Sequence, residues 1–221
     1  MKKYEFTGET KTVPLLFGDV TLHRIQAITS FANVVAGELG GWIEKEENLS
    51  HGGNAWVGGN AWVSGNAWVR DNARVSGNAR VGDNARVSGN ARVSGNAWVR
   101  DNARVSGNAE VSGNAWVRDN ARVRDNAEVK GNAEVKGNAQ VRDNAHVFST
   151  RHVLVIGAIG SRDAFTTFYR DKDNEITVKC GCFSGKIDKF LEKVAQTHGD
   201  SKYAQVYKKA VELAKLQILT D

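Results

Sequence analysis

Residues that interrupt or cross-link a chain are scarce in this sequence. One proline and two cysteines occur among its 221 residues. Cys180 and Cys182 are separated by a single residue, which is too short a spacing for an ordinary disulfide. We therefore expect a reducing compartment and place the protein in the cytoplasm, the host cytoplasm if a phage encodes it.

Long apolar runs and a strong charge of one sign are also missing. The longest apolar run, at 153–159, is far shorter than the ~18 residues of a membrane span, so we expect no membrane contact. No apolar run follows the basic start MKKYEFTGETK, which argues against a secretory signal. Thirty basic residues stand against 25 acidic ones, and this excess of +5 permits contact with a polyanion without requiring it.

The sequence is instead rich in one six-residue pattern. The unit N-A-x-V-x-(G or D) recurs sixteen times between Asn54 and Val147. The A-x-V alternation predicts a short strand with Ala and Val on one side, and the Gly and Asn that follow tolerate the left-handed backbone of a corner. Such short strands are stable only in stacked coils, which would bury every Ala and Val in one internal column.

The spacing of the repeats favours three hexads in each coil. At a period of eighteen, the corner positions 59, 77, 95, 113 and 131 are all glycine. The block NAWVRDNARV at 96–105 also recurs at 114–123, eighteen residues later. These observations predict a triangular prism with three different outer faces.

The pattern V-x-(G/D)-N-A-x resembles the hexapeptide repeat of left-handed parallel β-helix proteins. The resemblance implies the left hand of the helix and a homo-oligomer, preferably a trimer, formed by packing of prism faces. Residues 22–57 resemble the N-terminal segment of bacterial and prophage hexapeptide proteins that are often labelled acyltransferases. Leu39 lies eighteen residues before Val57, so we expect it in the inward column, and we expect residues 1–22 to cover the open end.

After Val147 the period stops, and the pattern predicts a small α+β domain. Strands are expected at 152–159, 165–170 and 176–182, followed by two helices. Ser184 is the expected cap of the first helix, and the two buried stripes are expected to contain Ile187, Phe190, Leu191 and Val194, then Tyr203, Val206, Tyr207, Ala210, Leu213 and Ala214. Residues 160–207 resemble a C-terminal module of phage and prophage proteins from Gram-positive bacteria, a resemblance that implies no particular function.

The predicted fold class is therefore mainly β. A left-handed parallel β-helix with three hexapeptides per coil precedes a small α+β C-terminal domain. The expected boundaries are 1–53 for an N-terminal cap with an irregular first coil, 54–148 for the regular helix, and 149–221 for the C-terminal domain.

Two of the three faces carry candidate binding residues. On the second face Trp98 and Trp116 would lie in successive coils with Arg100 and Arg118 beside them, a patch suited to a second copy of the protein or to a flat ligand. The third face carries arginines and no acid: Arg86, Arg104 and Arg122, flanked by Arg70, Arg124 and Arg142. Two sources could balance this positive charge: a bound polyanion, or the corner residues Asp83, Asp101 and Asp119.

The C-terminal domain has two weaker candidates. The glycines before a turn could present backbone N–H groups to an anion, with the candidate site formed by Gly160, Ser161, Arg162, Thr166 and Thr167; a plain turn is the alternative. Cys180, Cys182 and His198 supply fewer ligands than the four of a structural zinc site. Both cysteines fall on the inward-facing side of the expected strand, so we predict that they lie in the core and bind no metal.

The same reasoning does not favour catalysis. Hexapeptide acyltransferases typically place a catalytic His near a subunit junction and shape the pocket with an inserted loop. The sixteen repeats have no insertion, and neither His51 nor His146 has an orienting carboxylate nearby in the sequence. We expect no catalytic residue and no cofactor.

The sequence is thus interpreted as a non-enzymatic, phage-associated binding or scaffold protein. The prism would be a rigid assembly surface, and the C-terminal domain would bind a specific partner, such as a host protein in defence interference, or an anionic ligand. The alternatives are an anion or nucleic-acid binder that uses the arginine face, and a hexapeptide acyltransferase.

Overall fold

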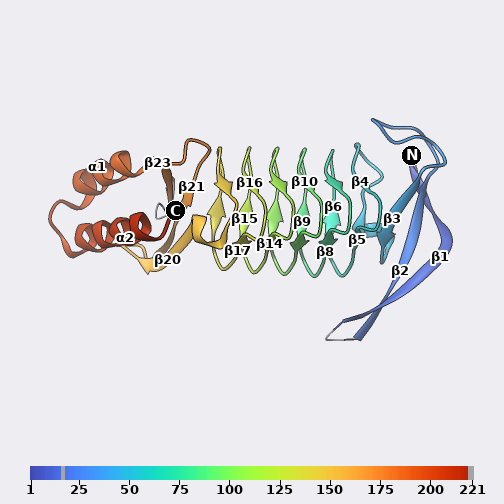
Figure 1. Cartoon of the computed structure of the whole chain (residues 1–221), viewed down its shortest axis with the longest axis horizontal. Coiled ribbons are helices and arrows are strands. Elements are labelled where there is room, and N and C mark those ends of the chain that lie inside the picture. Colours follow the sequence, from blue (N-terminus) through green and yellow to red (C-terminus); the bar gives the residue numbers. More distant parts are fainter. Residues whose placement is uncertain (16–17, 219–221) are drawn as a thin grey trace.

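The computed structural model describes residues 1–15 and 18–218, and it has three parts in a row (Figure 1). A β-hairpin lies at the N-terminal end, a three-sided β-solenoid of about six turns follows, and a domain of four strands and two helices closes the other end. The predicted fold class is confirmed.

Each face of the solenoid is a parallel sheet of two-residue strands that lie eighteen residues apart in the sequence. The first face contains β4 (Trp56–Val57), β7 (Arg74–Val75), β10 (Arg92–Val93), β13 (Glu110–Val111), β16 (Glu128–Val129) and β19 (His146–Val147). The second contains β5 (Trp62–Val63), β8 (Arg80–Val81), β11 (Trp98–Val99), β14 (Trp116–Val117) and β17 (Glu134–Val135). The third contains β6 (Trp68–Val69), β9 (Arg86–Val87), β12 (Arg104–Val105), β15 (Arg122–Val123) and β18 (Gln140–Val141).

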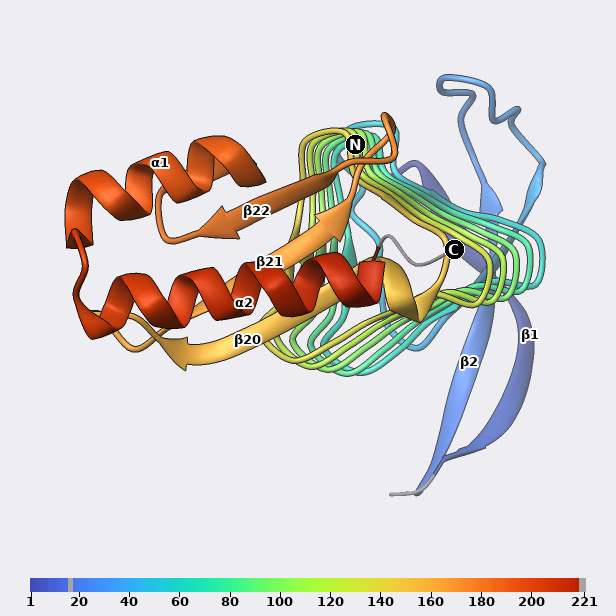
Figure 2. The same cartoon turned by 60° about the vertical axis from the view of Figure 1, so that its left-hand side comes forward.

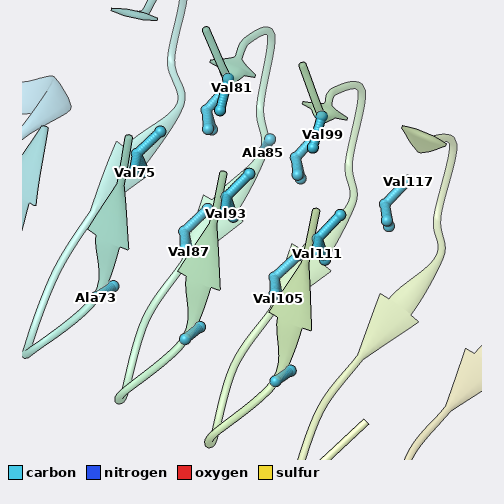
Figure 3. Packing of buried hydrophobic residues seen from close by; sticks show 14 of the residues in the cluster. Ala73, Val75, Val81, Ala85, Val87, Val93, Val99, Val105, Val111 and Val117 are labelled. Atoms are coloured by element: carbon cyan, nitrogen blue, oxygen red, sulfur yellow. The ribbon is translucent and has the colours of Figure 1, made fainter. Parts of the chain in front are cut away.

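The interior of the solenoid is a column of alanines and valines. Val87, Val105 and Val123 come from successive coils of one face, and all three are fully buried. Figure 3 shows such side chains meeting in the interior from different strands. The alternation in the sequence therefore places Ala and Val inside, as predicted, and the residue between them outside.

Each corner of the solenoid has glycine or aspartate at the position before the asparagine. Gly95 has φ +67° and Asp101 has φ +57°, a left-handed backbone that these two residue types tolerate well. The aspartates also pair with the next coil, because the backbone N–H of Asp119 donates to the Asp101 carboxylate at 3.0 Å. The asparagines have a different role from the one expected: their side chains form ladders between coils, as where Asn96 donates to Asn114 at 3.1 Å.

The N-terminal hairpin continues the second face. β1 (Tyr4–Leu15) and β2 (Gly18–Ala27) are antiparallel, and β2 pairs with β3 (Leu39–Ile43), which pairs in parallel with β5. Tyr4 and Ile25 are fully buried and join the Ala/Val core, whereas the far part of the hairpin projects beyond the solenoid wall (Figure 1). A short 3₁₀ turn, Glu46–Asn48, leads into the first regular coil.

The expectation that Leu39 enters the inward column is wrong. Leu39 is 53% exposed, and Ile43, which pairs with Val63, is the buried residue of β3. The register here is twenty residues rather than eighteen. Gly40 explains the close fit of β3 beneath the hairpin, because a Cβ at this position would lie 2.5 Å from Ile25.

The C-terminal domain is an antiparallel sheet covered by two helices. The sheet order is β20 (Val153–Ile159), β21 (Ala164–Arg170), β22 (Ile176–Cys180) and β23 (Phe183–Lys186). The helices are α1 (Ile187–His198) and α2 (Lys202–Ile218), and Figure 2 shows them side by side against the sheet. Phe168 and Val178 from the sheet are buried with Phe190 and Val211 from the helices.

Three local expectations for this domain are wrong. The third strand ends at Cys180, so Cys182 lies exposed in a turn rather than in the core. Ser184 belongs to β23 and donates to Asp143 at 2.7 Å instead of capping α1. In α2 the buried stripe contains Ala204 and Val211, while Val206 and Leu213 are exposed, since the sheet lies on a neighbouring side of the helix.

The sheet also closes the end of the solenoid. Val153 and Tyr169 are buried in the same core as the solenoid's valines. The backbone N–H of Gln140, in the last strand of the third face, donates to the Thr167 hydroxyl at 3.0 Å. One side of the sheet thus packs on the solenoid and the other on the helices.

Candidate functional site

The second face carries a stacked pair of tryptophans in its middle coils. Pairing of β11 with β14 places Trp98 beside Trp116, with ring centroids 5.0 Å apart and an interplanar angle of 9°. The Arg80 guanidinium lies 4.6 Å from the Trp98 ring, and that of Arg100 lies 5.5 Å from the Trp116 ring. Both faces of the Trp98 ring are therefore covered, and Trp116 remains 38% exposed. We call Trp98 and Trp116 the tryptophan pair.

Arg118 has a different neighbour from the one expected. Its Nε lies 2.7 Å from the Glu134 carboxylate and its Nη1 lies 3.5 Å from Asp119, so the guanidinium faces acids rather than the tryptophan pair. The hydrogen bond to Glu134 raises the pKa of the Arg118 guanidinium. Lys136 also pairs with Glu134, at 2.8 Å. Charges of both signs thus border the tryptophan pair.

A groove opens between the hairpin and the second face. Its volume is about 400 Å³, and its lining includes Val20 from β2, Glu44, and Arg80, Trp98 and Arg100 from the face. The hairpin covers the first tryptophans of the column, because Trp42 and Trp62 are buried with Leu22. The N-terminal segment also contacts the buried Trp56 through Phe31, while Trp68 on the third face is half-buried.

The third face presents a strip of exposed arginines, Arg86, Arg104 and Arg122, which we call the arginine strip. Parallel pairing places Arg104 directly beside both of the others. Within residues 1–15 and 18–218, no ion pair neutralises any of the three.

The predicted internal counter-charge for this strip is wrong. Asp101 lies 3.7 Å from Arg100 and Asp119 lies 3.5 Å from Arg118, both on the side of the second face. Asp83 accepts the backbone N–H of Asp101 at 3.2 Å. The corner aspartates therefore accept backbone N–H groups of the next coil and lie beside Arg100 and Arg118.

The predicted anion site of the C-terminal domain is only partly assembled. Gly160 has φ +77° in the turn between β20 and β21, and Ser161 and Arg162 follow it on the surface. Thr166 and Thr167 are buried on opposite sides of β21: Thr166 donates to the Cys180 sulfur at 3.2 Å, and Thr167 accepts from Gln140. The two threonines therefore do not meet the turn as one nest, since adjacent strand residues point to opposite faces.

No group of three or more metal-binding side chains gathers in the described part of the chain. His51 stacks on Tyr4 at 4.3 Å between ring centroids, and burial lowers the pKa of its imidazole. His146 stacks on Phe148 and has its Nε2 3.9 Å from the Glu128 carboxylate. Sequence reasoning missed this carboxylate, although the eighteen-residue spacing could have found it.

The solenoid is similar to known repeat proteins. The YdcK beta solenoid repeat family matches residues 85–101 and 103–119. The uncharacterized acetyltransferase YdcK of Escherichia coli (strain K12) is 36% identical over 61 residues, which make up 26% of this chain and 19% of that protein. The chain thus spans about a fifth of this relative's length.

These similarities support a β-solenoid of hexapeptide repeats. The family match covers the strands from β9 to β14, within the regular coils. Across residues 1–15 and 18–218, no helix has the length and apolar character to cross a membrane. The phage association, the cytoplasmic location and the C-terminal resemblance stay predictions from the sequence.

Proposed function

We propose that the protein is a binding scaffold whose second face joins copies of the chain into a homo-oligomer, a trimer as the hexapeptide resemblance implies. The tryptophan pair carries the proposal, because two large rings lie side by side on a flat sheet away from both ends. Since Trp116 covers one face of the Trp98 ring and Arg80 the other, the pair offers a poor stacking site for a flat ligand. It offers a better surface for a protein.

The charges around the pair suit a second copy of the same chain. Arg100 and Lys136 provide positive groups, and Asp101 and Glu134 provide negative groups, within the same few coils. A surface with both signs can complement itself when a neighbour is rotated against it. Burial of the rings at about 25 cal/mol per Å² contributes several kcal/mol before association costs.

A double substitution tests this proposal. Trp98→Ala with Trp116→Ala removes the apolar surface but leaves the Ala/Val core intact, so the fold should persist and the oligomer should dissociate. Sedimentation velocity measures the mass, and far-UV circular dichroism checks the fold. Trp68→Ala on the third face is the matched control and should keep the wild-type mass. A monomeric wild type, or an unchanged oligomer in the double variant, would refute assembly through this face.

Polyanion binding by the arginine strip is a second candidate, favoured by the lack of ion pairs on Arg86, Arg104 and Arg122 in the described chain. Arg104→Glu should shorten retention on heparin and reduce the slope of log affinity against log salt by about one. Arg92→Glu on the first face is the control and should change retention less. Wild-type protein that passes through heparin at low salt excludes this function.

Acetyl transfer is suggested by the relative's name and by the hexapeptide resemblance of the sequence. His146 with Glu128 is the pair that would act as a general base. If the wild-type protein turns over acetyl-CoA and the His146→Asn variant does not, the protein is an enzyme. This assay decides between an enzyme and a scaffold.

A further inference from the structure

A second hollow of about 400 Å³ lies in the C-terminal domain, between its two β-hairpin turns and its helices. Two hairpin turns border it, and the helices α1 and α2 complete its wall (Figure 2). We call it the C-terminal cavity. Its lining consists of Ser161, Arg162, Ala164, Cys180, Gly181, Cys182, Phe183, Phe190, Lys193, Val194, Thr197, His198 and Tyr207.

One wall of the C-terminal cavity is aromatic. Phe190 lies 5.4 Å from both Phe183 and Tyr207, measured between ring centroids, and Val194 is buried next to them on α1. Tilted and edge-on rings of this kind hold one another in place. The cavity therefore has a rigid apolar side suited to a flat, apolar body.

The other side carries two cations and no acid. Arg162 comes from the turn between β20 and β21 and Lys193 comes from α1, which also contributes the His198 ring. No Asp or Glu occurs among the described residues of the lining. Glu192, the neighbour of Lys193 in sequence, pairs with Lys189 at 3.0 Å on the helix exterior. Within residues 1–15 and 18–218, neither Arg162 nor Lys193 forms an ion pair with a carboxylate.

A chain of hydrogen bonds orients a further donor into the C-terminal cavity. The Thr166 hydroxyl donates to the Cys180 sulfur at 3.2 Å, and the thiol donates to the Tyr207 hydroxyl at 3.7 Å. Since Tyr207 accepts here, its own O–H remains available to a ligand. Burial and the contact with Cys180 raise the pKa of Tyr207 to about 12, so the hydroxyl keeps its proton at neutral pH.

We propose that the C-terminal cavity binds a phosphate monoester that carries an aromatic ring, such as a nucleoside monophosphate. The ring would lie on the wall of Phe183 and Phe190, and the phosphate would meet Arg162, Lys193 and the Tyr207 hydroxyl. A phosphate fits this set because it carries up to two charges and three terminal oxygens, matching two cations and one donor. The site is separate from the second face, so the proposal stands whatever the oligomeric state.

Calorimetric titration of the full chain with AMP tests the proposal. Adenosine supplies the ring without the charge and inorganic phosphate the charge without the ring, and each should bind about tenfold more weakly than AMP or not at all. Arg162→Ala and Lys193→Ala should each weaken AMP binding about tenfold, since each removes a charge-assisted hydrogen bond. Tyr207→Phe keeps the ring packing and should weaken binding about threefold or more.

Lys209→Ala is the matched control, because this exposed lysine of α2 pairs with Glu212 and lies outside the cavity lining, and the variant should bind AMP as wild type does. Cys182 gives a second measurement, since it is exposed at the lining and AMP should slow its alkylation by iodoacetamide. The proposal is overturned if neither AMP nor phenyl phosphate binds at millimolar concentration. It is also overturned if AMP binds equally to wild type and both cation variants, or leaves the alkylation of Cys182 unchanged.

Discussion

The solenoid and the C-terminal domain bury apolar side chains in different ways. In the solenoid each valine meets the valine eighteen residues away, so the position within the repeat determines the environment. In the C-terminal domain, Phe168 meets Phe190 and Tyr207 meets Cys180 across sequence separations that follow no period. The comparison shows that repetition converts sequence position directly into structural position.

The surfaces of the solenoid and of the C-terminal domain also differ. The solenoid presents flat faces on which a residue acts together with its neighbours in adjacent coils, as with the tryptophan pair. The C-terminal domain joins turns and helices into a concave site. A flat wall suits assembly or a long polymer, whereas a hollow suits a small molecule.

The largest expected effect breaks the periodic core. Val105→Asp places a carboxylate in a column that contains only Ala and Val around it, where neither water nor a hydrogen-bond donor is available. We expect a loss of about 4 kcal/mol or more in the free energy of unfolding, or an insoluble protein.

Arg104→Asp is the control for this change, because Arg104 precedes Val105 in β12 and is exposed. This variant should stay soluble and melt close to wild type. Thermal unfolding followed by circular dichroism compares the two. A soluble Val105→Asp variant with an unchanged melting temperature would contradict the inward placement of the valines.

Most of the solenoid could be predicted because every coil repeats one solution. The strands, the faces and the inward residues follow from the period, and His146 with Glu128 could have been paired by the same rule. The prediction failed at Leu39, where an antiparallel hairpin rather than a preceding coil sets the register. It also failed for the charges of the arginine strip, since the period gives neighbours but not the direction of a corner side chain.

Less of the C-terminal domain could be predicted, because its contacts depend on the tertiary fold. The alternation of apolar and polar residues predicts a third strand that continues to Cys182. A turn at Gly181, with φ +55°, ends the strand earlier. The predicted anion nest grouped Arg162 with its neighbours in the sequence, Gly160 and Ser161. The cavity instead joins Arg162 to Lys193 on α1, a pairing that only packing creates.

A smaller effect tests the non-periodic domain through Asp171. This buried carboxylate accepts from Thr177 at 2.7 Å and pairs with Lys186 at 2.6 Å. Burial alone would raise the pKa of Asp171, but the hydrogen bonds from Lys186, Thr177 and two backbone N–H groups hold it below its usual range. Because the pKa is lower in the folded state, the ionised Asp171 stabilises the domain above the unfolded pKa, and this stability is lost as pH falls through the folded pKa.

Asp171→Asn should therefore lower the free energy of unfolding at neutral pH by about 2 kcal/mol, the scale of a hydrogen bond to a charged group. The difference from wild type should shrink as the pH falls below about 4, near the unfolded pKa of an aspartate. Circular dichroism at the helix band reports on this domain, since α1 and α2 are the α-helices of residues 1–15 and 18–218. A difference that stays constant with pH would contradict this role of the Asp171 charge.

The smallest effect concerns the corners, where the solenoid alternates between aspartate and glycine. Asp101 has a left-handed backbone and accepts the N–H of Asp119. Asp101→Gly keeps the backbone relaxed and loses that half-buried hydrogen bond and the exposed ion pair with Arg100, so it should cost about 1 kcal/mol. Asp101→Ala loses the same bond and also forces a residue with a Cβ into the left-handed region, so it should cost about 1 kcal/mol more than the glycine variant. Melting temperatures of the two variants measure the difference, and equal values would contradict the idea that the left-handed backbone selects aspartate and glycine at the corners.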